Sequence, residues 1–526
     1  MTDIDGHWAE AAISRWASKQ IVKGYLDGSF KPDAPIKRAE FATIINRVFG
    51  FKAISQAEFS DVGGNEWFAS EIKKAVAAGY MIGYPDGTFK PEKNISRQEA
   101  AVVLARVIGL EATGENLNFS DSGSIPSWSR RAVSAIAQKG MITGYPDGSF
   151  KPAGAITRAE TVTVLDRYIA EIFTEEGSFG NAAEQTVISG SAVIQAKNIE
   201  LHNFHIKGDL YIAESVGDGT VTLDGVVVDG NITVKGGGAN SVILKNTKAI
   251  TLHVDKEGVR IVVQDGSQIA EAYILTSSLI EQAGGQGIKT LFIEEILGEA
   301  GVVLSGSFAN VSIRCEAGKI VLDGGHIDEL NIESAAEDVI FEIGPGASVQ
   351  NLVLNAPATV SGSGSIGTAT VNVSGAVIEQ QPAKVVLAEN VTAKIGGKEV
   401  TGTTSSTPPT TPPSDDEPKI IPLKSVSVTG DAKVGSTLTA EVKPPAATVS
   451  YQWLRSDGRE STYNIIEGAS GKTYELTAAD AGKYIKARAT GKGNYTGTVE
   501  SEPLGPVEAI PNVISNVLRV SVDVSQ

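Results

Sequence analysis

The stretch Gly24-Tyr25-Leu26-Asp27-Gly28-Ser29-Phe30 returns as Gly83-Tyr84-Pro85-Asp86-Gly87-Thr88-Phe89 and as Gly144-Tyr145-Pro146-Asp147-Gly148-Ser149-Phe150. Each copy is followed by a Lys-Pro pair and then by Lys37-Arg38-Ala39-Glu40, Ser96-Arg97-Gln98-Glu99 or Thr157-Arg158-Ala159-Glu160. A period near sixty residues, carried by whole phrases, indicates a tandem module and decides the architecture of this region. We therefore predict three repeats, at 1–55, 56–115 and 116–175.

Every repeat begins with an acidic segment that contains a tryptophan: Asp3…Trp8, Asp61…Trp67 and Asp121…Trp128. An amphipathic helix follows, since in the first repeat Trp8, Ala12, Ile13 and Trp16 share one helical face. Gly79 and Gly140 are predicted helix ends, and Gly28, Gly87 and Gly148 are predicted turn positions. Two interpretations of the tryptophans remain open, as core anchors or as platforms for a ligand.

The second helix of each repeat begins beside an arginine. Ser96-x-x-Glu99 and Thr157-x-x-Glu160 are capping boxes, so Arg97 and Arg158 are expected on the first helical residue. Free backbone N–H groups and the positive end of the helix dipole then lie next to a guanidinium, a combination that suits a carboxylate ligand. In the first repeat Lys37 replaces the capping hydroxyl beside Arg38. The alternative is that these arginines are solvated or paired with a nearby acid.

The pattern Asp…Trp…Gly-Tyr-x-Asp-Gly-x-Phe…Ile-(Lys/Ser/Thr)-Arg-x-Glu closely resembles the S-layer homology domain of bacterial surface proteins. The resemblance covers roughly residues 1–175 and implies an all-α pseudo-trimeric unit. The grooves of this unit would bind secondary cell-wall polysaccharide, often through a pyruvate ketal on N-acetylmannosamine. The arginine tied to polymer binding in that family corresponds to Arg38, Arg97 and Arg158.

The expected ligand-binding residues are drawn from the repeated motif, and the expected partner is a pyruvylated, peptidoglycan-linked wall glycan. A ketal pyruvate is a fixed carboxylate, so arginine would bind its charge while an aromatic side chain covers the sugar ring. Other surface-layer subunits are further candidate partners. The candidate residues are Arg38, Arg97, Arg158, Asp3, Asp61, Asp121, Trp8, Trp67, Trp128, Gly28, Gly87 and Gly148.

Composition excludes some classes of function. The formal charge of −17 argues against a nucleic-acid partner, and it is uneven: residues 1–180 carry 20 Lys and Arg against 22 Asp and Glu. Cys315 is the only cysteine, so no intramolecular disulfide is possible. No run of about eighteen apolar residues predicts a membrane span. No basic-then-apolar leader precedes the first repeat, which suggests a mature form.

Residues 181–400 change from helical to strand periodicity. Val311, Leu330, Leu352 and Val371 begin similar alternating segments, with steps of 19, 22 and 19 residues. Steps near twenty favour the coils of a parallel β-solenoid, expected to be right-handed, over a β-sandwich. The stretch from Ile269 to Leu297 fits this spacing poorly and predicts an inserted helix or an irregular coil.

A solenoid that degrades polysaccharides would need an Asp cluster and a base, or paired carboxylates. Arg260 and Arg314 are isolated in the sequence, and the turn positions of Asp224, Asp229 and Asp323 explain those residues. His202, His205, His253 and His326 lack metal-ligand spacing. Cys315 is interpreted as a buried apolar residue. We expect no catalytic residues, no metal and no cofactor.

Residues 401–422 are rich in Pro and Thr and predict a semi-rigid linker. Residues 423–508 predict an Ig-like β-sandwich, because Val449, Tyr451 and Trp453 alternate and Asp480 to Tyr484 resembles a tyrosine corner. Without a cysteine pair, Trp453 is expected to pack on aliphatic residues. Residues 509–526 are expected to begin a further segment.

The sequence thus predicts a multidomain, secreted surface protein of a Gram-positive-type bacterium, held non-covalently on the wall by its first 175 residues. It is not expected to be an enzyme. Two alternatives remain: a polysaccharide-degrading enzyme displayed by the same anchor, and an adhesin whose ligand binds the solenoid or the Ig-like domain.

Overall fold

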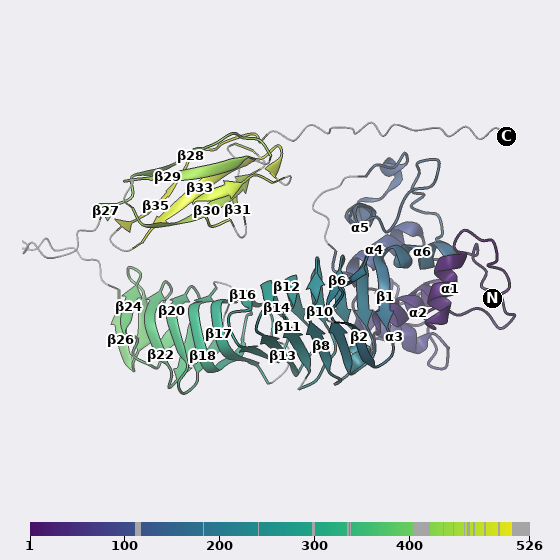
Figure 1. Cartoon of the computed structure of the whole chain (residues 1–526), viewed down its shortest axis with the longest axis horizontal. Coiled ribbons are helices and arrows are strands. Elements are labelled where there is room, and N and C mark those ends of the chain that lie inside the picture. The colour runs from purple at the N-terminus through teal and green to yellow at the C-terminus, as the bar shows by residue number, and fades with distance from the viewer. Residues whose placement is uncertain are drawn as a thin grey trace, which may run out of the picture. The chain divides into compact units, whose positions relative to one another are not determined.

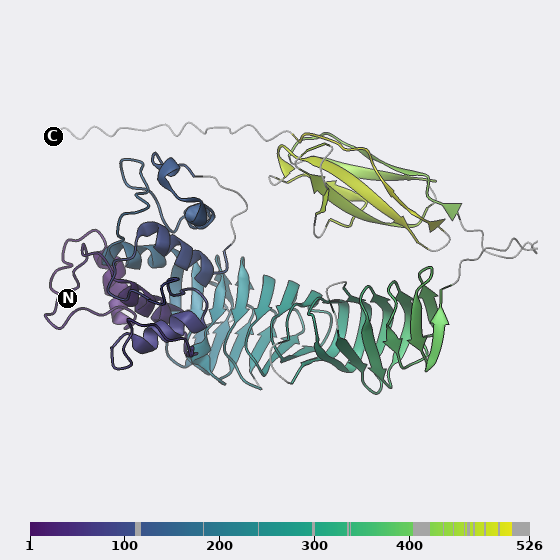
Figure 2. The ribbon, with the colours of Figure 1, turned by 180° about the vertical axis from the view of Figure 1, so that it is seen from behind.

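The computed structural model describes residues 1–110, 117–181, 183–239, 241–296, 300–333, 336, 338–402, 421–434, 436–444, 447–456, 458–459, 463–466, 469–477, 480–492 and 495–507. The chain divides into two compact units, Met1–Ser405 and Ser406–Gln526. In the first unit a helical part is followed by a long stack of strands (Figure 1, Figure 2). Most of the predicted linker and all of 509–526 lie outside the described residues.

Among the described residues, each repeat contributes two α-helices. The predicted capping boxes are present: Ser96 Oγ accepts from Glu99 N and Thr157 Oγ1 from Glu160 N, at 3.3 and 3.1 Å. Gly79 and Gly140 follow α3 and α5 with φ of 74° and 70°, the left-handed conformation that glycine tolerates best. The elements are α1 Glu10–Ser18, α2 Arg38–Phe49, α3 Ala69–Ala77, α4 Arg97–Val107, the short 3₁₀ helix η1 Ser122–Ser124, α5 Ser127–Gln138 and α6 Arg158–Tyr168.

The three repeats close into a ring around three isoleucines. Ile36 N donates to Ile156 O, Ile95 N to Ile36 O, and Ile156 N to Ile95 O, at 3.0 to 3.1 Å. All three side chains are fully buried. Since each repeat donates to one neighbour and accepts from the other, the arrangement has the pseudo-threefold form that the resemblance implies.

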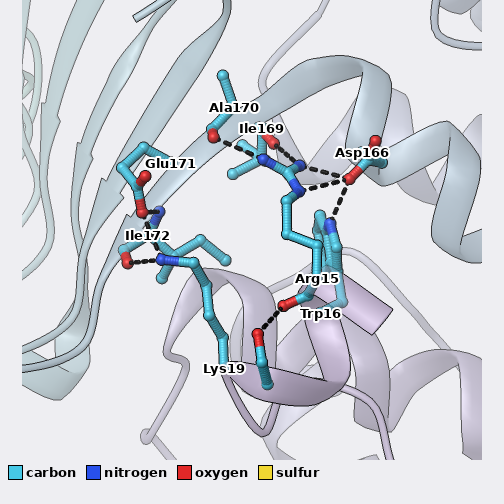
Figure 3. A network of polar contacts seen from close by, with 9 residues as sticks. Arg15, Trp16, Lys19, Asp166, Ile169, Ala170, Glu171 and Ile172 are labelled. Carbon is cyan, nitrogen blue, oxygen red and sulfur yellow. Dashed lines mark hydrogen bonds and ion pairs between the residues drawn. The ribbon is translucent and has the colours of Figure 1, made fainter. Parts of the chain in front are cut away.

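The first repeat is joined to the end of the third through α1 (Figure 3). Arg15 Nε donates to Asp166 Oδ1 at 2.9 Å, and its Nη1 donates to Ala170 O at 2.7 Å. Trp16 Nε1 donates to the same oxygen of Asp166 at 2.6 Å. A chain that begins and ends its helical part in contact holds all three repeats in register.

The strand stack is a parallel solenoid. In the described residues, β1 to β26 form one continuous sheet system, in which β4 pairs with β7, β7 with β10 and β10 with β12, all parallel. The antiparallel hairpin of β25 and β26 ends it. Inward residues alternate with outward ones, so one apolar core runs along the stack.

The strand bounds of the solenoid are β1 Ile169–Phe173, β2 Gly177–Gly180, β3 Thr186–Ile188, β4 Ser191–Ile194, β5 Ile199–His202, β6 Phe204–Ile206, β7 Leu210–Ile212, β8 Val221–Asp224, β9 Val227–Val228, β10 Asn231–Val234, β11 Val242–Lys245, β12 Lys248–Val254, β13 Val259–Gln264, β14 Gln268–Ile274, β15 Ser278–Ala283, β16 Ile288–Ile293, β17 Val302–Ile313, β18 Gly318–Ile332, β19 Val339–Ile343, β20 Ser348–Leu354, β21 Ala358–Gly362, β22 Ser365–Val371, β23 Val377–Ile378, β24 Lys384–Leu387, β25 Thr392–Ile395 and β26 Lys398–Thr401. A short 3₁₀ helix, η2 Glu214–Val216, lies between β7 and β8.

The stretch from Ile269 to Leu297 is regular solenoid over its described residues, and our expectation of an insertion there was wrong. It holds β14, β15 and β16, whose registers continue those of their neighbours. The spacing was misleading because Tyr273, Leu279 and Phe292 are large apolar residues on the outward positions. With apolar residues on both faces, these strands lack the apolar–polar alternation that is typical of a half-buried strand.

The helical part passes into the solenoid without a linker, because β1 begins directly after α6, twelve residues before the position predicted from spacing. Val193, Tyr211 and Ala213 of the solenoid belong to the apolar cluster of the helices. Tyr168 OH donates to Asp209 Oδ2 at 2.6 Å, within this buried junction. A fragment that ends at residue 175 would therefore cut through a shared core.

The second unit holds two antiparallel sheets, β28-β29-β32 and β31-β30-β33-β35, and the small pair β27-β34. Trp453 is fully buried and lies against the ring of Tyr474, with 5.6 Å between centroids, rather than on aliphatic residues alone. Near the predicted tyrosine corner, the hydroxyl that donates to buried Asp480 is that of Tyr474, at 2.8 Å. The strands are β27 Ile421–Pro422, β28 Ser425–Thr429, β29 Thr437–Lys443, β30 Val449–Ser456, β31 Asn464–Ile465, β32 Thr473–Glu475, β33 Tyr484–Gly491, β34 Tyr495–Thr496 and β35 Thr498–Glu500.

Candidate functional site

The three motif arginines are buried, with 4 to 6% of their surface exposed. Each reaches into the turn of the next repeat around the ring. Arg38 Nε donates to Phe89 O, Arg97 Nε to Phe150 O and Arg158 Nε to Phe30 O, at 2.8 to 3.0 Å. Their position follows from the capped helix start, which places the arginine at the seam between two repeats. The arginines therefore join the repeats, a role that the sequence alone did not reveal.

Two of these arginines also form ion pairs across the seams. Arg158 Nη1 lies 3.3 Å from Glu40 Oε1, and Arg97 Nη1 lies 3.1 Å from Glu160 Oε1. The same carboxylates accept a hydrogen bond from Tyr25 and Tyr145, at 2.8 and 2.7 Å. Burial and the hydrogen bond to Glu160 raise the pKa of Tyr145 to about 12. Breaking a buried pair of this kind costs about 3–5 kcal/mol, because the remaining charge has no partner.

The predicted aspartates hold the loops of the repeated phrase. Asp3 accepts from Phe30 N and Lys31 N at 2.6 and 2.7 Å. Asp61 and Asp121 accept from the two corresponding amides of their own repeats, at 2.7 to 2.8 Å. These backbone hydrogen bonds lower the pKa of Asp3. Both carboxylate oxygens are already engaged, so the aspartates position the loop.

The predicted glycines form the tips of these loops. Gly28, Gly87 and Gly148 have φ of 81°, 78° and 77°. This left-handed conformation is one that residues with a Cβ adopt rarely. Their carbonyls accept from Thr2 N, Ser60 N and Ser120 N, so they tie the beginning of each repeat to its loop.

The tryptophans, in contrast, are exposed. Trp8, Trp67 and Trp128 show 63, 59 and 57% of their surface. Trp8 and Trp67 precede the first helix of their repeats, since α1 begins only at Glu10 and α3 at Ala69, whereas Trp128 lies in the first turn of α5. The core interpretation of Trp8 on the face of Ile13 and Trp16 is thus wrong. Large exposed aromatic rings at the same place in three repeats form a surface available to a ligand.

Each tryptophan forms the wall of a cavity on the rim of the ring. Groove 1, about 360 Å³, is lined by Tyr25, Glu40 and Arg47 of the first repeat, Trp67 of the second and Arg158 of the third. Groove 3, about 580 Å³, is lined by the corresponding residues Tyr145, Glu160, Arg167, Trp8 and Arg97. We call groove 2 the third equivalent place, defined by Tyr84, Glu99, Arg106, Trp128 and Arg38.

A second arginine in each groove was missed by the sequence analysis. Arg47, Arg106 and Arg167 lie in the last turns of α2, α4 and α6. Within the described residues they have no carboxylate partner; Arg47 donates to Ile21 O at 3.4 Å and Arg167 to Met141 O at 3.2 Å. The available signal was their constant separation of nine residues from the motif arginine.

The grooves combine three chemical features. An exposed indole lines the same cavity as a guanidinium that has no acidic partner in the described part of the chain, and Thr43 in groove 1 and Thr163 in groove 3 add hydroxyls. An indole packs on the apolar face of a sugar ring, and a guanidinium binds a carboxylate through two parallel hydrogen bonds. In the described part of the chain, no three His, Cys, Asp or Glu side chains are placed to hold a metal ion. The arrangement suits recognition of an acidic sugar.

Several titratable groups of the solenoid form ion pairs between neighbouring coils. His205 Nε2 lies 2.8 Å from Asp229 Oδ1, and Arg260 Nη2 lies 2.6 Å from Glu281 Oε2. Cys315 is buried, as predicted, and burial raises the pKa of its thiol to about 11. Ion pairs such as His205–Asp229 and Arg260–Glu281 align neighbouring coils.

No helix among the described residues combines the length and the apolar character that a bilayer crossing requires. A family model described as the S-layer homology domain matches residues 1–42, 58–101 and 118–162. These three ranges coincide with the repeats that close into the ring.

Curated relatives match the same region. Cell surface glycoprotein 1 of Acetivibrio thermocellus is 39% identical over 162 residues, which are 28% of this chain and 7% of that protein. The cellulosome-anchoring protein of the same species is 34% identical over 155 residues, 28% of this chain and 35% of that protein. Amylopullulanase of Thermoanaerobacterium thermosulfurigenes is 35% identical over 170 residues, 31% of this chain and 9% of that protein.

This chain thus spans about a third or less of the length of these relatives. One of them carries the name of an enzyme, so the shared region accompanies enzymes as well as anchoring proteins. The shared region is the helical part with its three grooves. The N-terminal part of this protein therefore consists of three S-layer homology domains.

Proposed function

We propose that this protein is held non-covalently on a bacterial cell wall, and that its grooves bind a pyruvylated secondary cell-wall polysaccharide. S-layer homology domains anchor surface proteins to the wall, and cell-surface and surface-layer proteins are among the relatives of this chain. It is thus a secreted surface-layer or surface-layer-associated protein. Its partner is the wall glycan linked to peptidoglycan, with other surface-layer subunits as further partners.

One observation carries the proposal: in groove 1 and again in groove 3, an exposed tryptophan lines the same cavity as an arginine that has no acidic partner among the residues that the structure describes. A ketal pyruvate offers a carboxylate held on a sugar ring, so a single sugar unit of the polymer can contact both the tryptophan and the arginine. Arg47 and Arg167 bind the charge, while Trp67 and Trp8 cover the ring. Because the grooves lie on one rigid ring, a single polymer engages more than one of them and gains avidity.

The solenoid and the second unit follow this anchor in the sequence. The solenoid shares a core with the helices, so it transmits force without a flexible joint. The two sheets of the second unit form an Ig-like domain that acts as a spacer or an adhesion unit.

The test is co-sedimentation of the full chain with purified walls, before and after chemical removal of the pyruvate ketal. We expect binding to untreated walls and little binding to depyruvylated walls. The variant Arg47→Gln/Arg167→Gln should lose binding while keeping its fold. The matched control is Lys52→Gln/Lys139→Gln, which removes two exposed positive charges from the helical part outside grooves 1 and 3.

Equal binding to both wall preparations would contradict pyruvate recognition. Wild-type binding by Arg47→Gln/Arg167→Gln would contradict the groove assignment. If the control lost binding to the same extent, net charge rather than the grooves would explain attachment.

A displayed polysaccharide-degrading enzyme is the alternative that the name of one relative raises, and release of reducing sugar from wall or plant polysaccharide by the full chain would favour it. The adhesin alternative draws on a row of rings on the solenoid: His253, Tyr273 and Phe292 stack at 5.0 to 5.1 Å. The rings cover one another's faces, and Arg314 lies 4.0 Å from the centroid of Phe292. We therefore assign the row to the cohesion of the coils.

A further inference from the structure

The three grooves differ at one position that the backbone makes strictly comparable. The amides of Arg38, Arg97 and Arg158 donate to the carbonyls of Lys93, Gly154 and Ala34, at 2.8 to 3.0 Å. Residues 34, 93 and 154 therefore occupy the same place in the three repeats. Groove 1 has alanine there and groove 3 has glycine, whereas groove 2 has a lysine.

The lysine folds back into its own groove. Lys93 Nζ donates to Tyr84 OH at 3.0 Å and lies 3.1 Å from Glu99 Oε1. Its ammonium is 5.3 Å from the centroid of the Tyr84 ring. These contacts raise the pKa of Lys93, with the hydrogen bond to Tyr84 as the largest cause, so the side chain is charged at neutral pH.

The cavities follow this difference. In grooves 1 and 3 the lining runs from the tryptophan to the half-buried tyrosine and glutamate and to the buried motif arginine. The cavity of about 450 Å³ beside Trp128 is lined by Arg106, Arg131 and the apolar side of α4, and its lining does not include Tyr84, Glu99 or Arg38. Val102 also stands where Thr43 and Thr163 supply a hydroxyl.

We infer that Lys93 closes the inner part of groove 2, so that the anchor engages two acidic sugars rather than three. This rests on the proposed function of the grooves and adds the number and identity of the sites. A ligand entering groove 2 must break the contacts of Lys93 with Tyr84 and Glu99. We expect this to weaken binding there by about tenfold relative to grooves 1 and 3, the factor that corresponds to about 1.4 kcal/mol.

The test uses the full chain labelled with fluorotryptophan, whose five resonances are assigned by Trp→Phe variants and followed by ¹⁹F NMR. The probe is a methyl glycoside of N-acetylmannosamine that carries a pyruvate ketal. We expect the resonances of Trp8 and Trp67 to move at probe concentrations that leave Trp128 in place. In Lys93→Ala, Trp128 should respond at the same concentrations as the other two.

Two matched variants test the role of the cation, one by keeping it in groove 2 and one by introducing it into groove 1. Lys93→Arg keeps a cation in place and should leave groove 2 closed, while Ala34→Lys should close groove 1 and silence Trp67 alone. Three equal responses in the unchanged protein would overturn the inference, as would an unresponsive Trp128 in Lys93→Ala. A folded protein in which no tryptophan responds would overturn the proposed function of the grooves, and this inference with it.

Discussion

Replacing Arg158 with alanine separates a structural role of the motif arginines from a role in ligand binding. Its guanidinium donates to Phe30 O at 2.8 Å and to Lys23 O at 3.1 Å, and pairs with Glu40 at 3.3 Å. Alanine removes all three contacts and leaves the half-buried Glu40 without its cation. We expect a loss of about 3–5 kcal/mol in the free energy of unfolding. Domains are stable by about 5–15 kcal/mol, so the ring would lose a large part of its stability.

The comparison variant is Arg47→Ala in the same groove. Arg47 is half-buried and makes one long hydrogen bond of 3.4 Å to Ile21 O. It has no acidic partner in the described residues, so its loss should cost about 1 kcal/mol or less. Both variants remove one positive charge, but only Arg158 contacts residues of a different repeat.

The assay is urea unfolding of the full chain, followed by tryptophan fluorescence. Four of the five tryptophans lie in the helical part, so the signal reports mainly on the ring. Wall co-sedimentation is measured on the same samples. We expect Arg158→Ala to lower the urea midpoint strongly, and Arg47→Ala to keep the midpoint and lose wall binding. A wild-type midpoint for Arg158→Ala, combined with lost wall binding, would refute the structural role of Arg158 and would indicate that this arginine binds the ligand.

Gly50→Ala should destabilise the junction of helices and solenoid by about 1–3 kcal/mol in thermal unfolding, because a Cβ at φ 67° would lie 2.5 Å from a side-chain oxygen of the solenoid. The matched control is Gly6→Ala, which has φ 68° but no atom within 4 Å of the added Cβ. Equal losses of stability in the two variants would contradict a steric cause. The hydroxyl of the residue two positions on lowers the pKa of both Asp27 and Asp86 to about 2. Because these folded-state pKa values lie below the unfolded value, their stabilisation is present above about pH 4 and is lost as the pH falls towards 2; Asp27→Asn/Asp86→Asn should flatten acid unfolding in this window, and an unchanged slope would count against it. Cys315 should react with iodoacetamide at pH 8 only after unfolding, since its thiol is buried and its pKa is about 11; rapid labelling of the native chain would disprove this.

Local chemistry explains which features the sequence could predict. Capping boxes, glycine helix ends and strand alternation depend on residues a few positions apart, so α4, α6 and most coils of the solenoid follow from their own segments. The same logic failed at 269–297, where stacked rings on the outward face imitate the composition of a core. It also failed at Trp8, because helical spacing does not tell whether the helix has yet begun.

The sequence by itself determined the three repeats, the capped helix starts beside Arg97 and Arg158, and the parallel coils that follow. Only the tertiary structure decided that these arginines are buried between repeats, and that Arg47 and Arg167 line the grooves with no acidic partner among the described residues. It also decided that Lys93 lies across its own groove. The physical reason is that the partner of a charged side chain can come from a different repeat, which local sequence does not reveal. Arg158 of the third repeat pairs with Glu40 of the first repeat, more than a hundred residues away.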